Sequence, residues 1–76
     1  MTQQALSKAR PRAQKALADS PIFALRDLKV EHAEGALLIS GTVSSFYHKQ
    51  LAQEVVRAVA SEVAVVNSVQ VRNDSI

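Results

Sequence analysis

The stretch from Leu37 to Val43 constrains the fold of this chain more than any other. It reads Leu-Leu-Ile-Ser-Gly-Thr-Val, and at a period of two one of its faces carries Leu37, Ile39, Gly41 and Val43. That face is apolar, so we predict the middle strand of a small sheet with one buried face. A glycine inside a strand often marks a close approach by another backbone. We therefore expect a helix to cross the sheet at Gly41.

The length and composition limit the choice of architecture. The chain has 76 residues, which is enough for one domain. It has no cysteine, so disulfides and thiolate metal sites are excluded, and it has only three aromatic residues. The core must therefore be built from Val, Leu, Ile and Ala, which suits helices packed on a sheet.

The first helix is indicated by small and apolar residues at helical spacing, namely Leu6, Ala9, Ala13, Ala16 and Leu17. Pro11 interrupts this pattern, and proline is tolerated in the first turn of a helix but not in its interior. We therefore expect the packed helix to begin near Arg10 or Pro11 and to end near Asp19. Residues 1–10 are then a basic, flexible leader, or they add a further helical turn across a kink.

A hairpin is predicted in the middle of the chain. Residues 22–27 fit either one helical turn or an irregular connector, with some apolar side chains covering the end of the core. Residues 28–33 then alternate as a first strand, with His32 half-buried. Gly35 can supply a positive φ between this strand and the Leu37 strand, so we expect the two strands to be antiparallel.

A helix and a strand complete the predicted fold. Ser44 and Ser45 offer an N-cap for a helix over about residues 46–61. Its predicted core stripe is Leu51, Ala52, Val55 and Ala58 or Val59, with Tyr47 or His48 at the start. Residues 63–71 are the last strand, which a right-handed crossover places parallel to the second. The predicted class is α+β, in the order α-β-β-α-β, with two helices packed on one face of a three-stranded sheet. The domain covers residues 11–72, and residues 73–76 form a tail.

The charge is uneven along the chain. The first 18 residues contain no acid and four basic residues, which are Lys8, Arg10, Arg12 and Lys15. The rest of the chain has five basic and seven acidic residues, so its net charge is −2. We expect these four cations to contact anionic phospholipid at up to about 1 kcal/mol each. The alternative is a solvated arm with no partner.

Several short patterns together resemble the BON domain, a family named for bacterial osmotic-shock and nodulation proteins. The resemblance covers about residues 13–71 and is carried by the strand Leu37-x-Ile39-Ser40-Gly41-x-Val43, the Ser44-Ser45 helix entry, Ala52, and Val63-x-x-Val66-Asn67-x-Val69-x-Val71. Asp19-Ser20-Pro21 after the first helix also fits. The family usually has glycine where this chain has Glu62, so the end of the second helix is the least certain part of the prediction.

The resemblance implies a non-enzymatic binding module associated with phospholipid and envelope maintenance. Members are usually exported, and potassium-binding relatives suggest a carbonyl-lined ion site as a further option. The family motif carries no catalytic residues and implies no cofactor.

Other functions receive less support from the residues. His32 and His48 are the only histidines, and Glu31 and His32 face opposite ways on a strand, so we predict neither a metal site nor catalysis. The GxxG loop of KH-type RNA modules is absent, so no nucleic-acid partner is expected. The alternative to lipid binding is interaction with another protein or another copy, through the uncovered sheet face that carries Leu38, Ser40 and Thr42.

The location follows from what the sequence lacks. No apolar run reaches the length of a signal peptide or a membrane span. We expect a cytoplasmic location for the chain as it stands, and a periplasmic or envelope location if an export signal preceded it.

Overall fold

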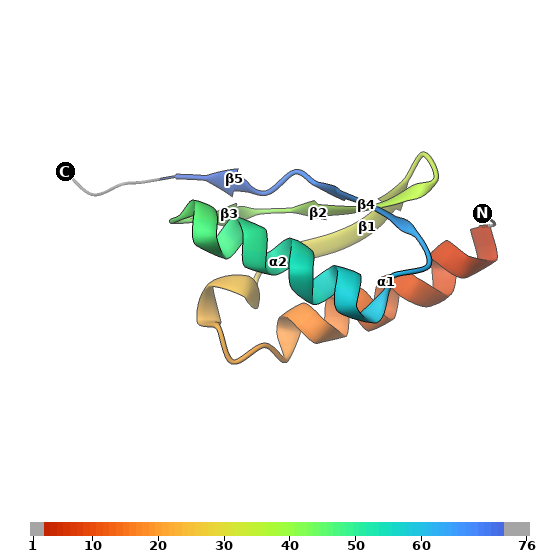
Figure 1. Cartoon of the computed structure of the whole chain (residues 1–76), viewed down its shortest axis with the longest axis horizontal. Coiled ribbons are helices and arrows are strands. Elements are labelled where there is room, and N and C mark those ends of the chain that lie inside the picture. The colour runs from red at the N-terminus through yellow and green to blue at the C-terminus, as the bar shows by residue number, and fades with distance from the viewer. Residues whose placement is uncertain (1–2, 73–76) are drawn as a thin grey trace.

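The computed structural model describes residues 3–72 and shows two helices packed beneath a twisted sheet (Figure 1). The helices are α1 (Gln3–Ala18) and α2 (Phe46–Val59), with a 3₁₀ turn, η1 (Phe23–Leu25), between α1 and the first strand. The strands are β1 (Lys29–Ala33), β2 (Ala36–Ser40), β3 (Thr42–Val43), β4 (Ala64–Asn67) and β5 (Gln70–Val71).

The sheet is mixed. β1 and β2 form an antiparallel hairpin, and β4 lies parallel to β2 on its other side, so the strand order is β1-β2-β4. β3 and β5 form a second parallel pair beyond the ends of β2 and β4. Both helices cover the same face of the sheet (Figure 1), so the predicted α+β class is confirmed.

The hairpin turn lies where the sequence places it. Glu34 and Gly35 both have positive φ, at 53° and 83°, which turns the chain sharply between β1 and β2. Val30 faces Ile39 across the pair, and both side chains are buried. His32 is exposed rather than half-buried, and it lies beside the hairpin turn on β1, an edge strand of the sheet.

The middle strand departs from the prediction at Gly41. Leu37, Ile39 and Val43 are buried as expected, but Gly41 is exposed and has φ +130°, so it separates β2 from β3. A Cβ at this position would lie 2.6 Å from Cδ2 of Leu28, the residue just before β1. The close neighbour is therefore the adjacent strand of the hairpin, and the expected helix crossing at Gly41 was wrong.

α1 begins about two turns earlier than the predicted start near Arg10 or Pro11. It starts at Gln3 and contains Pro11 within it. Leu6 and Ala9 are buried in the core on the same stripe as Ala13 and Leu17. Burial of this stripe explains why the helix continues through a proline that lacks one backbone N–H.

α2 begins as predicted and ends two residues early. The Ser45 hydroxyl accepts a hydrogen bond from the backbone N–H of His48 at 3.2 Å, so the N-cap is confirmed. Ala52 and Val56 are buried, Leu51 and Val55 pack against the core, and Ala58 and Val59 are exposed, so the last turn of the predicted stripe was wrong. The residue that ends α2 is Ala60, and its φ of −142° is negative. Glu62, which stands where the family usually has glycine, does not adopt a positive φ either.

The last predicted strand is interrupted between β4 and β5. The Asn67 side chain explains the break: its Nδ2 donates to the Lys49 carbonyl at 2.8 Å, and its Oδ1 accepts from the Val69 N–H at 3.2 Å. These bonds tie the strand to α2 and bend it locally. Ladder bonds resume at once, since the Gln70 N–H donates to the Gly41 carbonyl at 2.9 Å.

Candidate interaction surfaces

The predicted basic residues lie along α1. Lys8, Arg12 and Lys15 are exposed, and Arg10 is partly buried. Folding brings acids to two of them: Arg12 pairs with Glu62, and Lys15 Nζ lies 2.5 Å from Asp19 Oδ2. Exposed pairs of this kind contribute little, so they can exchange partners with a ligand. The four cations are thus accessible to different degrees and do not form one unpaired cluster.

The pKa values of Glu62 and Lys15 are shifted by the contacts of these two ion pairs. A hydrogen bond from its own backbone, followed by one from Arg12, lowers the pKa of Glu62 below its ordinary value. The hydrogen bond to Asp19 and the charge of that carboxylate raise the pKa of Lys15. Both shifts favour the charged form, of the Glu62 carboxylate in one pair and of the Lys15 ammonium in the other.

The partly buried face of α1 closes one edge of the sheet. Gln14 Nε2 donates to the Leu28 carbonyl at 2.9 Å, and Gln14 Oε1 accepts from the Val30 N–H at 2.9 Å. Arg10 Nη1 donates to the Val30 carbonyl at 3.4 Å. These side chains satisfy the outward carbonyl of Leu28 and both outward backbone groups of Val30, much as another strand would. Arg10 therefore has a structural contact in addition to its charge.

The sheet face opposite the helices carries the second predicted site. Leu38 and Ser40 are partly buried, and Thr42 is exposed. Leu38 lies opposite Glu31 on one side and Val66 on the other, and Val66 is 48% exposed. Val66 therefore extends the apolar part of this face, which sequence reasoning did not identify because the register between β2 and β4 was unknown.

The aromatic side chains are the main feature that sequence reasoning missed. Phe23, Phe46 and Tyr47 are 79%, 75% and 68% exposed, so all three aromatics of the chain lie at the surface. The Arg26 guanidinium stands 4.5 Å from the Phe23 ring centroid. We expected part of the 22–27 connector to cover the core, and Leu25 does so while Phe23 does not. A three-residue turn has too little periodicity to distinguish the two from sequence.

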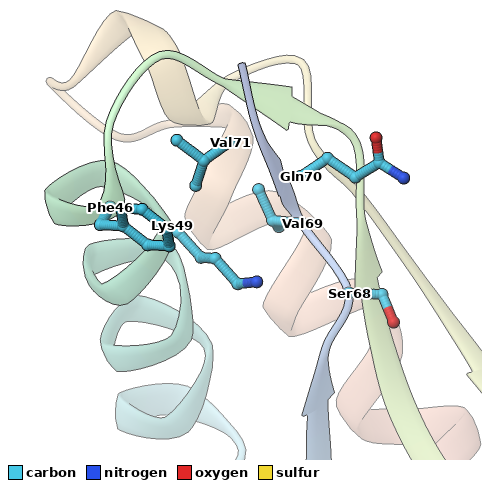
Figure 2. Close-up of a pocket in the computed structure, with 6 residues that line it drawn as sticks. All are labelled: Phe46, Lys49, Ser68, Val69, Gln70 and Val71. Carbon is cyan, nitrogen blue, oxygen red and sulfur yellow. The ribbon is translucent and has the colours of Figure 1, made fainter. Parts of the chain in front are cut away.

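A groove of about 540 Å³ lies between the first turn of α2 and β5. Figure 2 shows Phe46 and Lys49 on the helix side and Val69 and Val71 on the strand side. Ser68 and Gln70 complete its lining. These two segments are about 20 residues apart in the chain, so only the tertiary structure brings them together.

Two further features were looked for in the described part of the chain, a metal-ligand cluster and a membrane-spanning helix. Within residues 3–72, no three His, Asp or Glu side chains are grouped as metal ligands. No helix in that range has the length and apolar character needed to span a membrane.

The chain was also compared with known protein families and with curated proteins. None of the curated proteins matches the chain. The model of the BON domain family matches residues 6–73, nearly the whole chain and a longer span than the sequence patterns indicated. The match includes α1 from Leu6, in keeping with the burial of that residue. BON domains are generally non-catalytic binding modules, and the chain belongs to the BON domain family.

Proposed function

We propose that this chain is a non-enzymatic binding module that attaches weakly to anionic phospholipid surfaces. Its contact is the exposed face of α1 together with η1, the turn that follows it. The observation that carries this proposal is the position of Phe23, which is 79% exposed just after a helix rich in cations. Stable attachment to a membrane normally takes two signals, and here the two are positive charge and an apolar ring.

The charge signal comes from α1. Lys8 is exposed, and Arg12 and Lys15 are each held only by a surface ion pair. Near an anionic surface each cation contributes up to about 1 kcal/mol, so three give roughly 3 kcal/mol at most. That alone is marginal, and the binding should weaken strongly with salt.

The apolar signal comes from η1. The Phe23 ring carries the Arg26 guanidinium above it, so an apolar surface and a further cation occupy the same turn. Aromatic rings are favoured at the boundary between headgroups and acyl chains. A ring inserted there would add to the charge attraction without requiring a deep span.

Vesicle co-sedimentation tests the proposal. The protein is mixed with vesicles of phosphatidylglycerol and phosphatidylcholine, or of phosphatidylcholine alone, at low salt and at about 0.5 M salt, where the Debye length falls to a few ångströms. We expect binding to the anionic vesicles at low salt only. Phe23→Ser and the double variant Lys8→Gln/Lys15→Gln should each reduce it.

A charge-matched control separates a specific contact from net charge. Lys29→Gln/Arg72→Gln also removes two positive charges, but both residues lie outside α1 and η1. We expect this control to bind almost as well as the wild type. Equal losses in both double variants would show attraction by overall charge alone, and no binding at low salt would exclude the lipid function and favour a protein partner.

Self-association through the uncovered sheet face stays a prediction. The observation that favours it is the pair Leu38 and Val66, which are neighbours on that face. The patch is small, and the polar side chains of Ser40 and Thr42 follow it along the same face. It supports a weaker case than the combination of cations and Phe23.

A further inference from the structure

We propose that Arg26 is a positioning residue for the lipid contact. Its guanidinium holds the Phe23 ring in one outward orientation, so that the ring meets the bilayer already ordered. The stacked cation and ring then match the phosphate and the acyl region of a phospholipid. This role rests on the proposed function, and it gives Arg26 a task that a positive charge alone does not perform.

The backbone that carries Phe23 is held on both sides of the ring. Leu25 is fully buried, and Ile22 packs against the core. Ser20 is 5% exposed, and its hydroxyl accepts a hydrogen bond from the Ile22 N–H at 3.0 Å. Pro21 lies between these two residues and has a fixed φ. Phe23 therefore leaves a fixed backbone at the start of η1, which lies on the helix side of the sheet (Figure 1).

Arg26 contacts this segment in three places. Its backbone N–H donates to the Phe23 carbonyl at 3.1 Å, and its side-chain Nε donates to the Ser20 carbonyl at 2.7 Å. The guanidinium carbon lies 4.5 Å from the centroid of the Phe23 ring, within the range of a cation–π contact. The Nε bond ties the guanidinium plane to the backbone, and the ring packs on that plane. The ring therefore has fewer orientations than an exposed ring without such a contact.

Order of the ring in the free protein favours binding. A side chain that becomes immobilised on binding loses conformational entropy, and this loss is smaller when its orientation is already restricted. Aromatic rings are favoured at the boundary between headgroups and acyl chains. The Nη groups of Arg26 take no part in the bond to Ser20, so they can donate to a lipid phosphate above the inserted ring. Lysine has the same charge but neither the planar face nor the forked donors.

Arg26→Lys separates position from charge. With vesicles of phosphatidylglycerol and phosphatidylcholine at low salt, we expect this variant to bind roughly three- to tenfold more weakly, the effect of one side chain that must be ordered on binding. Arg57→Lys makes the same replacement at an exposed position of α2 and should bind like the wild type. Circular dichroism and urea denaturation check that both variants are folded. Binding of Arg26→Lys at wild-type strength would show that charge alone matters and would overturn the proposal.

A double-mutant cycle shows whether Arg26 acts through the ring. Phe23→Ser removes the ring, so Arg26→Lys should have little further effect on vesicle binding in that background. A role in the fold alone, or a lipid contact independent of the ring, would give the same loss with and without Phe23. An equal loss in the two backgrounds would therefore contradict the positioning role.

Tryptophan fluorescence measures the order of the ring without lipid. The chain has no tryptophan, so Phe23→Trp reports on this position alone, and an indole ring is a good partner for a guanidinium. We expect a high fluorescence anisotropy in the free protein, which Arg26→Lys lowers and Arg57→Lys leaves unchanged. The same anisotropy with and without Arg26 would show that this residue does not order the ring.

The lipid function and the role of Arg26 can fail separately. Absence of wild-type binding to the anionic vesicles at low salt would refute the lipid function and, with it, this role of Arg26. Wild-type binding together with unchanged anisotropy, or with full binding by Arg26→Lys, would refute the role of Arg26 and leave the lipid function standing.

Discussion

Substitution of Gly41 by alanine tests the account of the middle strand. Gly41 has φ +130°, a conformation that costs a residue with a Cβ about 1–3 kcal/mol. The new Cβ would also lie 2.6 Å from Leu28 Cδ2 and 3.5 Å from Leu28 Cα, so the buried Leu28 side chain must move. Overpacking of this kind costs about 1–3 kcal/mol. We expect Gly41→Ala to lower the free energy of unfolding by about 2–6 kcal/mol.

Gly35 provides the matched control. It also has a positive φ, at 83°, but a Cβ there has no neighbour within 4 Å. Gly35→Ala should therefore show backbone strain without crowding and cost about 1–2 kcal/mol. A 76-residue domain has about 4–11 kcal/mol of stability in total, so the difference between the two variants is measurable.

The assay is urea denaturation followed by circular dichroism at the helix signal, since the chain has no tryptophan. A double-mutant cycle with Leu28→Ala isolates the contact, because removing the Leu28 side chain should relieve the crowding at Gly41. We expect a coupling free energy of about 1–3 kcal/mol. Zero coupling, or equal costs for Gly35→Ala and Gly41→Ala, would refute the reasoning.

Two further predictions concern α1. Gln14→Ala removes both bonds to the β1 edge and should cost about 1–3 kcal/mol in urea denaturation, whereas Gln50→Ala, at an exposed position of α2, should cost little. The lowered pKa of Glu62 means that its contribution is present above its ordinary pKa of 4.5 and is lost as pH falls through the lower folded value. Glu62→Gln should therefore flatten the decline of the thermal midpoint below about pH 4.5. An unchanged acid profile would show that neither the backbone hydrogen bond of the Glu62 carboxylate nor its pairing with Arg12 contributes to stability.

Much of the fold could be read from local patterns. The Leu37–Val43 alternation and the N-cap at Ser45 each depend on residues close together in the chain, so periodicity and capping rules identify them. The start of α1 could not be found in this way. Local rules place Pro11 at a helix start, but the burial of Leu6 and Ala9 against the sheet overrides that preference.

The candidate surfaces were predictable to a smaller extent. The exposed cations of α1 are visible in the sequence, but their pairing with Glu62 is not, because that acid is 50 positions from Arg12. The exposure of Phe23 and Phe46 was not predicted, since an isolated aromatic in a short turn or first helical turn has no periodic context that assigns it to a face.

The sequence by itself determined the class of fold, the order of its elements, the aliphatic composition of the core and the family, because these follow from the spacing of residue types along the chain. Tertiary structure alone decided which neighbour comes close at Gly41 and which sheet edge is covered. It also brought Phe46 and Lys49 of α2 beside Val71 of β5. These features depend on distances between segments far apart in the chain, which the packing of helices on the sheet sets and no local pattern encodes.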